Sequence, residues 1–152
     1  MKSKLHAIVG TIALACIGTF WMSTLVSELF LNESSVLAVK NGVLAAMWLL
    51  IPAMAATGAS GFALSRGRSS RLVAVKKQRM KVIAANGIFV LLPCAFSLAS
   101  MANAGRFDML FYTIQGLELV AGAVNFVLLA LNMRDGLRLA GRFSAYAPLR
   151  SQ

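Results

Sequence analysis

Four long apolar runs constrain the fold of this chain more than any other feature of its sequence. They cover residues 5–31, 37–64, 82–104 and 109–133, and most of the charged residues lie between them. Each run exceeds the ~20 residues that a helix needs to cross about 30 Å of hydrocarbon. None shows the alternation of side chains that a barrel strand requires. The sequence therefore predicts an all-α integral membrane protein, an up-down-up-down four-helix bundle forming a single transmembrane domain over residues 1–152.

The composition excludes several other classes of protein. Hydrophobic residues make up 59% of the chain and charged residues 13%, whereas soluble domains average roughly 45–50% and about 25%. A soluble globule of this size needs more polar groups to cover its surface. Cys16 and Cys94 lie inside apolar runs without disulfide or zinc spacing. We therefore exclude a soluble enzyme, a disulfide scaffold and a disordered chain, and we expect no metal site.

The basic residues predict the orientation in the membrane. Thirteen of the 15 lie at the N-terminus, in the loop over residues 65–81 or in the tail over residues 134–152, and only Lys40 and Arg106 lie on the other side. Under the positive-inside rule both termini and this loop are cytoplasmic. The net charge of +10 follows from this pattern and does not indicate nucleic-acid binding.

The loop over residues 65–81 is the only sizeable connection expected between the membrane spans. Residues 72–81 contain no glycine or proline and could extend the third span as a basic helix. Its charge fits contact with anionic lipids, and a docking site for an acidic partner protein is the alternative. The expected partners are thus the lipid bilayer and, further, a partner protein or a second copy of the chain.

Polar residues recur on one face of the fourth span. Spacings of three and four predict that they form one seam directed away from lipid, which cannot satisfy such groups. The seam consists of Gln115, Glu118, Gly122, Asn125, Leu129 and Asn132. On the third span a similar stripe consists of Asn86, Pro93, Ser97 and Ser100. If these spans are antiparallel, Asn86 and Asn125 can share hydrogen bonds. Helix packing explains the asparagines, and a ligand site is the alternative.

Glu118 lies deep enough that its carboxylate must be neutral, paired with a cation or exposed to water. A functional role and a packing role both remain open for it. Glu28 and Lys40 could form a pair across the first outer loop. His6 is the only histidine of the chain. We expect it to lie at the lipid headgroups, and haem b ligation by His6 is the alternative.

Several short strings are shared with other proteins. They are Phe20-Trp21 with Ser23-Thr24-Leu25, Asn86-Gly87, Gln115 with Glu118, and Asn132-Met133-Arg134-Asp135-Gly136. Together they resemble an uncharacterised family of small four-span bacterial inner-membrane proteins. The resemblance implies a bacterial inner membrane and no particular activity.

No nucleotide-binding, metalloprotease or serine-hydrolase motif occurs in the sequence, and we identify no catalytic residue. The sequence favours a non-enzymatic accessory or assembly subunit, or a small-molecule binder that uses the seam. One alternative is a small proton-coupled transporter in which Glu118 exchanges a proton for a cation. The other is a b-type haem protein for electron transfer.

Overall fold

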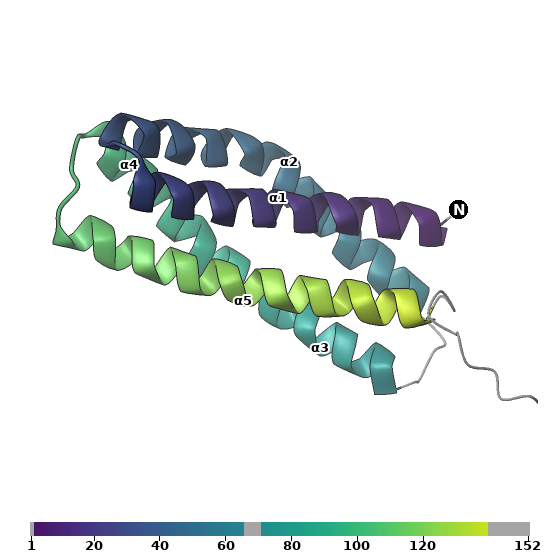
Figure 1. Ribbon diagram of the computed structural model, residues 1–152. Helices are drawn as coiled ribbons and strands as arrows, with labels where there is room; N and C mark the ends of the chain where they lie inside the picture. Colours follow the sequence, from purple (N-terminus) through teal and green to yellow (C-terminus); the bar gives the residue numbers. More distant parts are fainter. Residues whose placement is uncertain (1, 66–70, 140–152) are drawn as a thin grey trace, which may run out of the picture.

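The computed structural model describes residues 2–65 and 71–139 of the chain. Four helical segments in this part are long and apolar enough to cross a membrane, and no strand occurs in it. The first two are α1 (Lys2–Phe30) and α2 (Glu33–Ser65). The third consists of α3 (Arg71–Asn86), the π-helical turn η1 (Gly87–Leu91) and α4 (Leu92–Asn103). The fourth is α5 (Met109–Leu139) (Figure 1).

The largest departures from the expected boundaries are at the start of the third segment and at the end of the fourth. α3 begins at Arg71, so most of the segment expected as a basic loop is helical, as the absence of glycine and proline allowed. α5 continues to Leu139 and includes the first residues of the expected tail. A helix does not end at the membrane surface unless a residue there breaks it. Residues 66–70 and 140–152 of the loop and tail lie outside the described part.

Side-chain caps define where two of the helices begin. Asn32 Oδ1 accepts a hydrogen bond of 3.0 Å from the Ser35 backbone N–H at the start of α2. Asp108 Oδ1 accepts one of 3.0 Å from the Phe111 N–H at the start of α5. Gly105, with φ of +65°, follows α4 and reverses the chain at the short connection to α5. Short connections of this kind make consecutive helices spatial neighbours.

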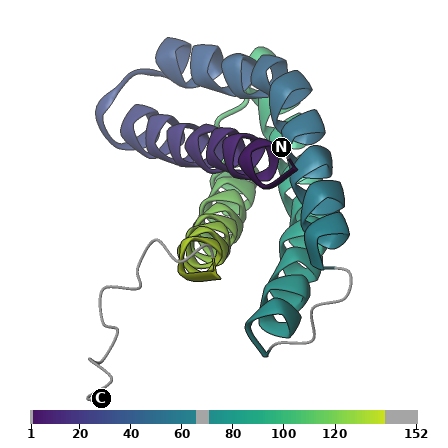
Figure 2. The same ribbon diagram turned by 90° about the vertical axis from the view of Figure 1, so that its right-hand side faces the viewer.

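The helices pack in a closed order around a shared interior. α1 packs against α2 and α5, α2 packs also against α4, and α5 packs also against α3, η1 and α4 (Figures 1 and 2). Within the described residues, the backbones of α2 and α5 do not approach each other. These two helices therefore face each other diagonally, and only long side chains can join them.

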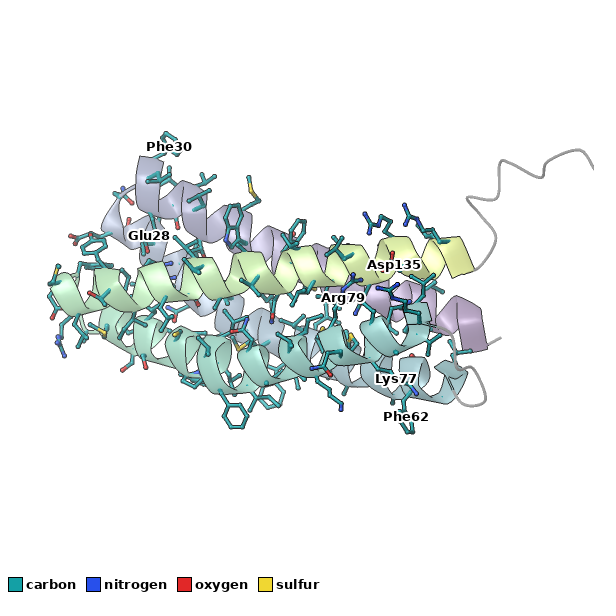
Figure 3. All side chains as sticks on the ribbon, turned by 90° about the horizontal axis from the view of Figure 1, so that it is seen from below. Glu28, Phe30, Phe62, Lys77, Arg79 and Asp135 are labelled. Carbon is teal, nitrogen blue, oxygen red and sulfur yellow. The ribbon has the colours of Figure 1, made fainter. Side chains whose placement is uncertain are left out.

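The outer surface is strongly apolar. Trp48 is 86% exposed and Phe89 is 77% exposed. Phe30 and Phe62 also project outward (Figure 3). Apolar surface of this extent is not stable in water, and a bilayer covers it. The chain is therefore a small polytopic membrane protein, as the sequence predicted.

The π-helical turn η1 changes which face of the third segment is buried. A regular helix that directs Asn86 inward would also direct Pro93, Ser97 and Ser100 inward, as the predicted stripe requires. Those three residues are instead exposed, so that part of the prediction is wrong. The buried positions are Cys94, Ala95, Leu98, Ala99, Met101 and Ala102.

The difference is a shift of one residue, which is what a single π-turn inserts into a helix. The turn lies just before Pro93, the second residue of α4. Proline has no N–H with which to continue the regular hydrogen-bond ladder. The set of residues that faces the interior therefore shifts by one position at the point where the hydrogen-bond ladder is interrupted.

Candidate functional site: a polar interior along helix α5

The inward face of α5 carries the polar seam along most of its length. Gln115 is 3% exposed, Asn125 is 2% exposed and Asn132 is 7% exposed. Leu129 is buried between the last two. The seam faces the other helices because the chain keeps spacings of three and four over five turns of α5. The polar residues of the interior form three groups along α5. One lies around Glu118 near the start of the helix, one around Asn125 in the middle and one around Asp135 near the end.

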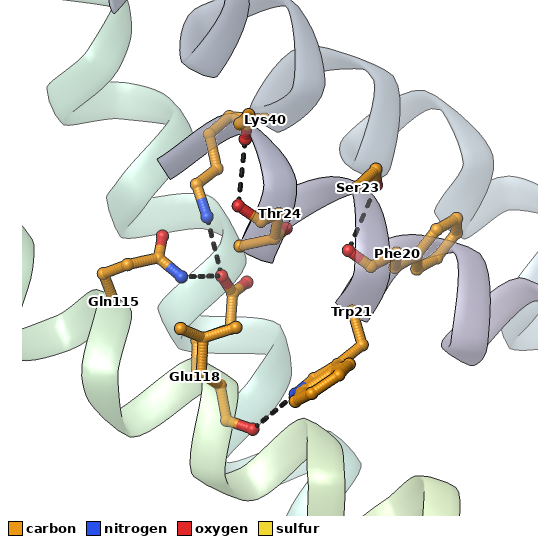
Figure 4. A network of polar contacts seen from close by, with 9 residues as sticks. Phe20, Trp21, Ser23, Thr24, Lys40, Gln115 and Glu118 are labelled. Atoms are coloured by element: carbon orange, nitrogen blue, oxygen red, sulfur yellow. Dashed lines mark hydrogen bonds and ion pairs between the residues drawn. The ribbon is translucent and has the colours of Figure 1, made fainter. Parts of the chain in front are cut away.

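The first group centres on an ion pair between α2 and α5. Lys40 Nζ lies 2.8 Å from Glu118 Oε2, and the two side chains are 2% and 14% exposed. Gln115 Nε2 also donates to Glu118 Oε2, at 3.4 Å (Figure 4). The long aliphatic stem of Lys40 lets its ammonium cross the interior between the two diagonal helices. Of the options open to Glu118, the structure therefore favours pairing with a cation.

The expected pair between Glu28 and Lys40 is not formed. Lys40 points across the interior to Glu118 instead. Glu28 remains close enough to interact electrostatically with both Lys40 and Glu118. We name these residues, Glu28, Lys40, Gln115 and Glu118, the outer cluster. It contains two carboxylates and one ammonium, and therefore carries one excess negative charge when both carboxylates are ionised.

Two oxygen atoms of the outer cluster lack a donor. Glu28 Oε1 and Gln115 Oε1 are buried, and neither has a hydrogen-bond partner among the residues that the structure describes. A buried acceptor without a partner costs about 1–3 kcal/mol, and more when it is charged. The outer cluster therefore lacks hydrogen-bond donors for these two oxygens.

Helix α1 closes the interior beside this cluster. Trp21 Nε1 donates to the Leu119 carbonyl at 2.9 Å (Figure 4). Its ring packs on Gly122, where an added Cβ would lie 3.1 Å from Trp21 Cδ1. Ser27 Oγ donates to the Thr24 carbonyl within α1 and is thus satisfied locally. Gly122 permits the close approach of α1, whereas Gly116, also on α5, is exposed and does not contribute to it.

The middle group consists of two asparagines. Asn86 Nδ2 donates to Asn125 Oδ1 and to the Ala121 carbonyl, both at 2.9 Å. Asn125 Nδ2 donates to the Ile83 carbonyl at 3.3 Å. The hydrogen bond expected between Asn86 and Asn125 is thus present. Bonds of this kind between membrane helices contribute about 0.6–2 kcal/mol each. The middle group satisfies itself and joins α3 to α5.

The third group lies where α5 ends. Arg79 Nη1 on α3 lies 2.6 Å from Asp135 Oδ2, and Asp135 is almost completely buried. Sequence analysis did not single out this pair, although the Arg79 and Asp135 positions flank the third and fourth apolar runs on the same predicted side. Asn132, one turn before Asp135, belongs to the same end of the interior.

His6 is packed between α1 and α2. Its Nδ1 lies 2.9 Å from Ser60 Oγ, and its ring lies on Gly61, where an added Cβ would be 3.2 Å from His6 Cε1. In the described part of the chain, no three histidine, cysteine, aspartate or glutamate side chains gather as a metal site would require.

The outer surface contains a groove that is lined mainly by apolar side chains. It has a volume of about 670 Å³ and runs between α1 and α5. Its lining includes Gly18, Met22 and Phe126, and it carries no charged residue. An acyl chain of the bilayer fits such a surface. The polar interior is therefore the candidate functional site.

Comparison of the chain with protein-family models, with curated proteins and with solved structures gives no match.

Proposed function

We propose that the four helical segments cross a bacterial inner membrane in alternate directions, with both termini in the cytoplasm. The distribution of the basic residues supports this orientation. Lys77 and Arg79 lie at one end of the molecule and Glu28 at the other (Figure 3). In this arrangement the outer cluster lies nearer the periplasmic side, and the pair of Arg79 and Asp135 lies nearer the cytoplasmic side.

Within this bundle we propose a non-enzymatic binding function, in which the outer cluster holds a small cation. The observation that supports it is the pair of unpartnered buried oxygens, Glu28 Oε1 and Gln115 Oε1, in a cluster where two carboxyl groups share the single ammonium of Lys40. A small cation that donates hydrogen bonds, or a bare monovalent metal ion, supplies both the charge and the contacts that these atoms lack.

The geometry favours Glu28 over Glu118 as the acid that meets the cation. Glu118 Oε2 is already held by Lys40 and Gln115. A carboxylate that exchanges a proton for a cation must be able to release its existing partners. Glu118 is held by both the ammonium of Lys40 and the amide of Gln115. This pairing favours a binder over the proton-coupled exchanger built on Glu118.

The test uses the full chain in nanodiscs and follows thermal unfolding with increasing sodium, ammonium or methylammonium chloride. Tetramethylammonium chloride, whose ion is larger and has no hydrogen-bond donor, serves as the salt control. We expect a saturable rise in Tm with at least one of the small cations. Glu28→Gln should abolish the rise, whereas Glu33→Gln, an exposed acid at the start of α2, should preserve it.

A rise in Tm of equal size with tetramethylammonium, or in the Glu28→Gln variant, would contradict the proposal. No rise with any cation would also contradict it, and would leave the outer cluster as a purely structural element.

A further inference from the structure

A second set of groups that lack partners lies at the opposite end of the interior, where α1 begins and α5 ends (Figure 1). It combines side chains from α3 and α5. We name Lys76, Arg79, Asn132 and Asp135 the inner cluster. The proposed cation site contains none of these residues.

The carboxylate of the inner cluster, that of Asp135, already forms ion pairs with two guanidinium groups. Asp135 Oδ2 lies 2.6 Å from Arg79 Nη1, and Asp135 Oδ1 lies 3.5 Å from Arg134 Nε. Lys76 interacts electrostatically with Asp135 but forms no ion pair in the described part of the chain. Three cations thus surround one carboxylate, and the ammonium of Lys76 is the one left over.

Lys76 is half-buried, and its ammonium lies beside a glycine of α5. Its Nζ lies against Gly136, where an added Cβ would be only 2.9 Å away. The absence of a side chain at position 136 therefore makes room for the ammonium beside α5. Arg79 is 21% exposed, and its ion pair with Asp135 uses one of its three nitrogen atoms. Both cations retain N–H donors.

Asn132 supplies a further donor at the same place. It lies four residues before Gly136 and three before Asp135, so the three share one face of α5. Asn132 is 7% exposed, and neither its Nδ2 nor its Oδ1 has a partner within residues 2–65 and 71–139. An amide buried in this way indicates a ligand that the protein itself does not provide.

We propose that the inner cluster binds a phosphate group. Phosphate offers several strong acceptor oxygens and negative charge, which match the ammonium of Lys76, the remaining donors of Arg79 and the amide N–H of Asn132. The source is a phospholipid headgroup or free phosphate. With the termini in the cytoplasm, the site lies at the level where cytoplasmic-leaflet headgroups meet the helices.

The test uses the full chain in a neutral detergent, with thermal unfolding and native mass spectrometry as readouts. The probes are phosphatidic acid, diacylglycerol as its counterpart without phosphate, and inorganic phosphate. We expect phosphatidic acid to raise Tm and diacylglycerol to have no effect. Stabilisation by inorganic phosphate as well would indicate free phosphate as a second source, and its failure to stabilise would assign the site to the headgroup.

Variants separate this site from general attraction to basic residues. Lys76→Gln should weaken phosphatidic acid binding about tenfold or more, because it removes the ammonium from the cluster. Lys77→Gln changes the charge by the same amount at the next residue, whose ammonium lies over the Phe62 ring. It should leave the affinity within about twofold.

Asn132→Leu gives a result that a structural role does not predict. It removes an amide without partners, so it should raise Tm in the absence of phosphate and lower the affinity for phosphatidic acid. Equal losses in Lys76→Gln and Lys77→Gln would overturn the proposal, as would binding of diacylglycerol as tight as that of phosphatidic acid, or no binding of either phosphate probe.

Discussion

Lys40 Nζ and Glu118 Oε2 lie 2.8 Å apart in the interior, and they join two helices whose backbones do not approach each other in the described residues. Among the described residues, Lys40 is the only buried cation near this pair, and its ammonium faces two carboxyl groups. These belong to Glu118 and Glu28. Removing one member of a buried pair leaves the other without compensation. Loss of Lys40 therefore leaves two carboxyl groups without a cation, whereas loss of Glu118 leaves the Lys40 ammonium with Glu28 still nearby.

Lys40→Met should destabilise the protein by about 3–5 kcal/mol, because it leaves two carboxylates in the interior without a cation. Glu118→Gln should cost less, about 1–2 kcal/mol, because Lys40 keeps Glu28 nearby. Unfolding in mixed detergent micelles measures both. Adding Glu118→Gln to Lys40→Met should recover part of the loss, and equal costs for the two single variants would contradict this account.

Gly122→Ala and Gly116→Ala form a matched pair on α5. A Cβ at position 122 would lie 3.1 Å from Trp21 Cδ1, whereas a Cβ at position 116 meets nothing within 4 Å among the described residues. Gly116→Ala should stabilise the helix by about 0.5–1 kcal/mol. Gly122→Ala should instead destabilise the protein by about 1 kcal/mol or more, as overpacking does.

Fluorescence reports on the same change. In a Trp48→Phe background, Trp21 is the only tryptophan left. Its emission should shift in Gly122→Ala, because the indole N–H loses its bond to the Leu119 carbonyl, and should stay constant in Gly116→Ala. A stabilising Gly122→Ala with unchanged emission would argue against close packing of α1 on α5.

Deletion of Ile88 tests the phase shift at η1. Ile88 is 60% exposed, and removing one residue from a π-turn restores a regular helix without rotating the segments on either side. The deletion should therefore leave both Asn86 and Leu98 facing the interior. Deletion of Phe96, which is 57% exposed in α4, should rotate the residues that follow it and destabilise the protein.

Alkylation of Cys94 in a Cys16→Ala background measures the outcome. Cys94 is 6% exposed, so it should be protected in the parent protein and in the Ile88 deletion. Rapid labelling of Cys94 in the Ile88 deletion would contradict this prediction, because it would show that the helix no longer directs Cys94 toward the interior.

Asp108 should make stability depend on pH. The hydrogen bond from Arg106, followed by that from the Phe111 N–H, lowers the pKa of Asp108 below its usual value. A carboxyl whose pKa is lower in the folded state stabilises that state above the pKa of the unfolded chain, about 3.9. This contribution is lost as the pH falls through the folded pKa.

Thermal unfolding of the Asp108→Asn variant provides the comparison, because asparagine keeps the cap and loses the charge. The difference in Tm between parent and variant should be present at neutral pH, disappear in acid and shrink in high salt. A difference independent of pH would assign the effect to the cap alone.

Sequence reasoning predicted the parts of the fold that depend on periodicity. The helices, the inward face of α5 and the bond between Asn86 and Asn125 all follow from apolar run length and from spacings of three and four. Such patterns depend on neighbours along one helix, which a sequence displays directly.

The partners of the charged groups were not predictable in the same way. Lys40 was assigned to Glu28, which is near in sequence, whereas it binds Glu118, 78 residues away, across the interior. The choice depends on which helices lie diagonally opposite each other, and this is a property of the packed molecule. The stripe through Pro93, Ser97 and Ser100 failed for a local reason, since a single π-turn has no distinct pattern of apolar residues.

Asp135 lies 17 residues beyond Glu118 on α5, or about 25 Å of helix, which is close to the thickness of the hydrocarbon layer. Over that length the buried polar side chains of α5 are the amides of Asn125 and Asn132, and the described residues include no buried charge between Glu118 and Asp135. The two ionic ends are thus separated by an uncharged stretch of the interior. A voltage applied across a membrane that holds the protein would fall mainly along this stretch.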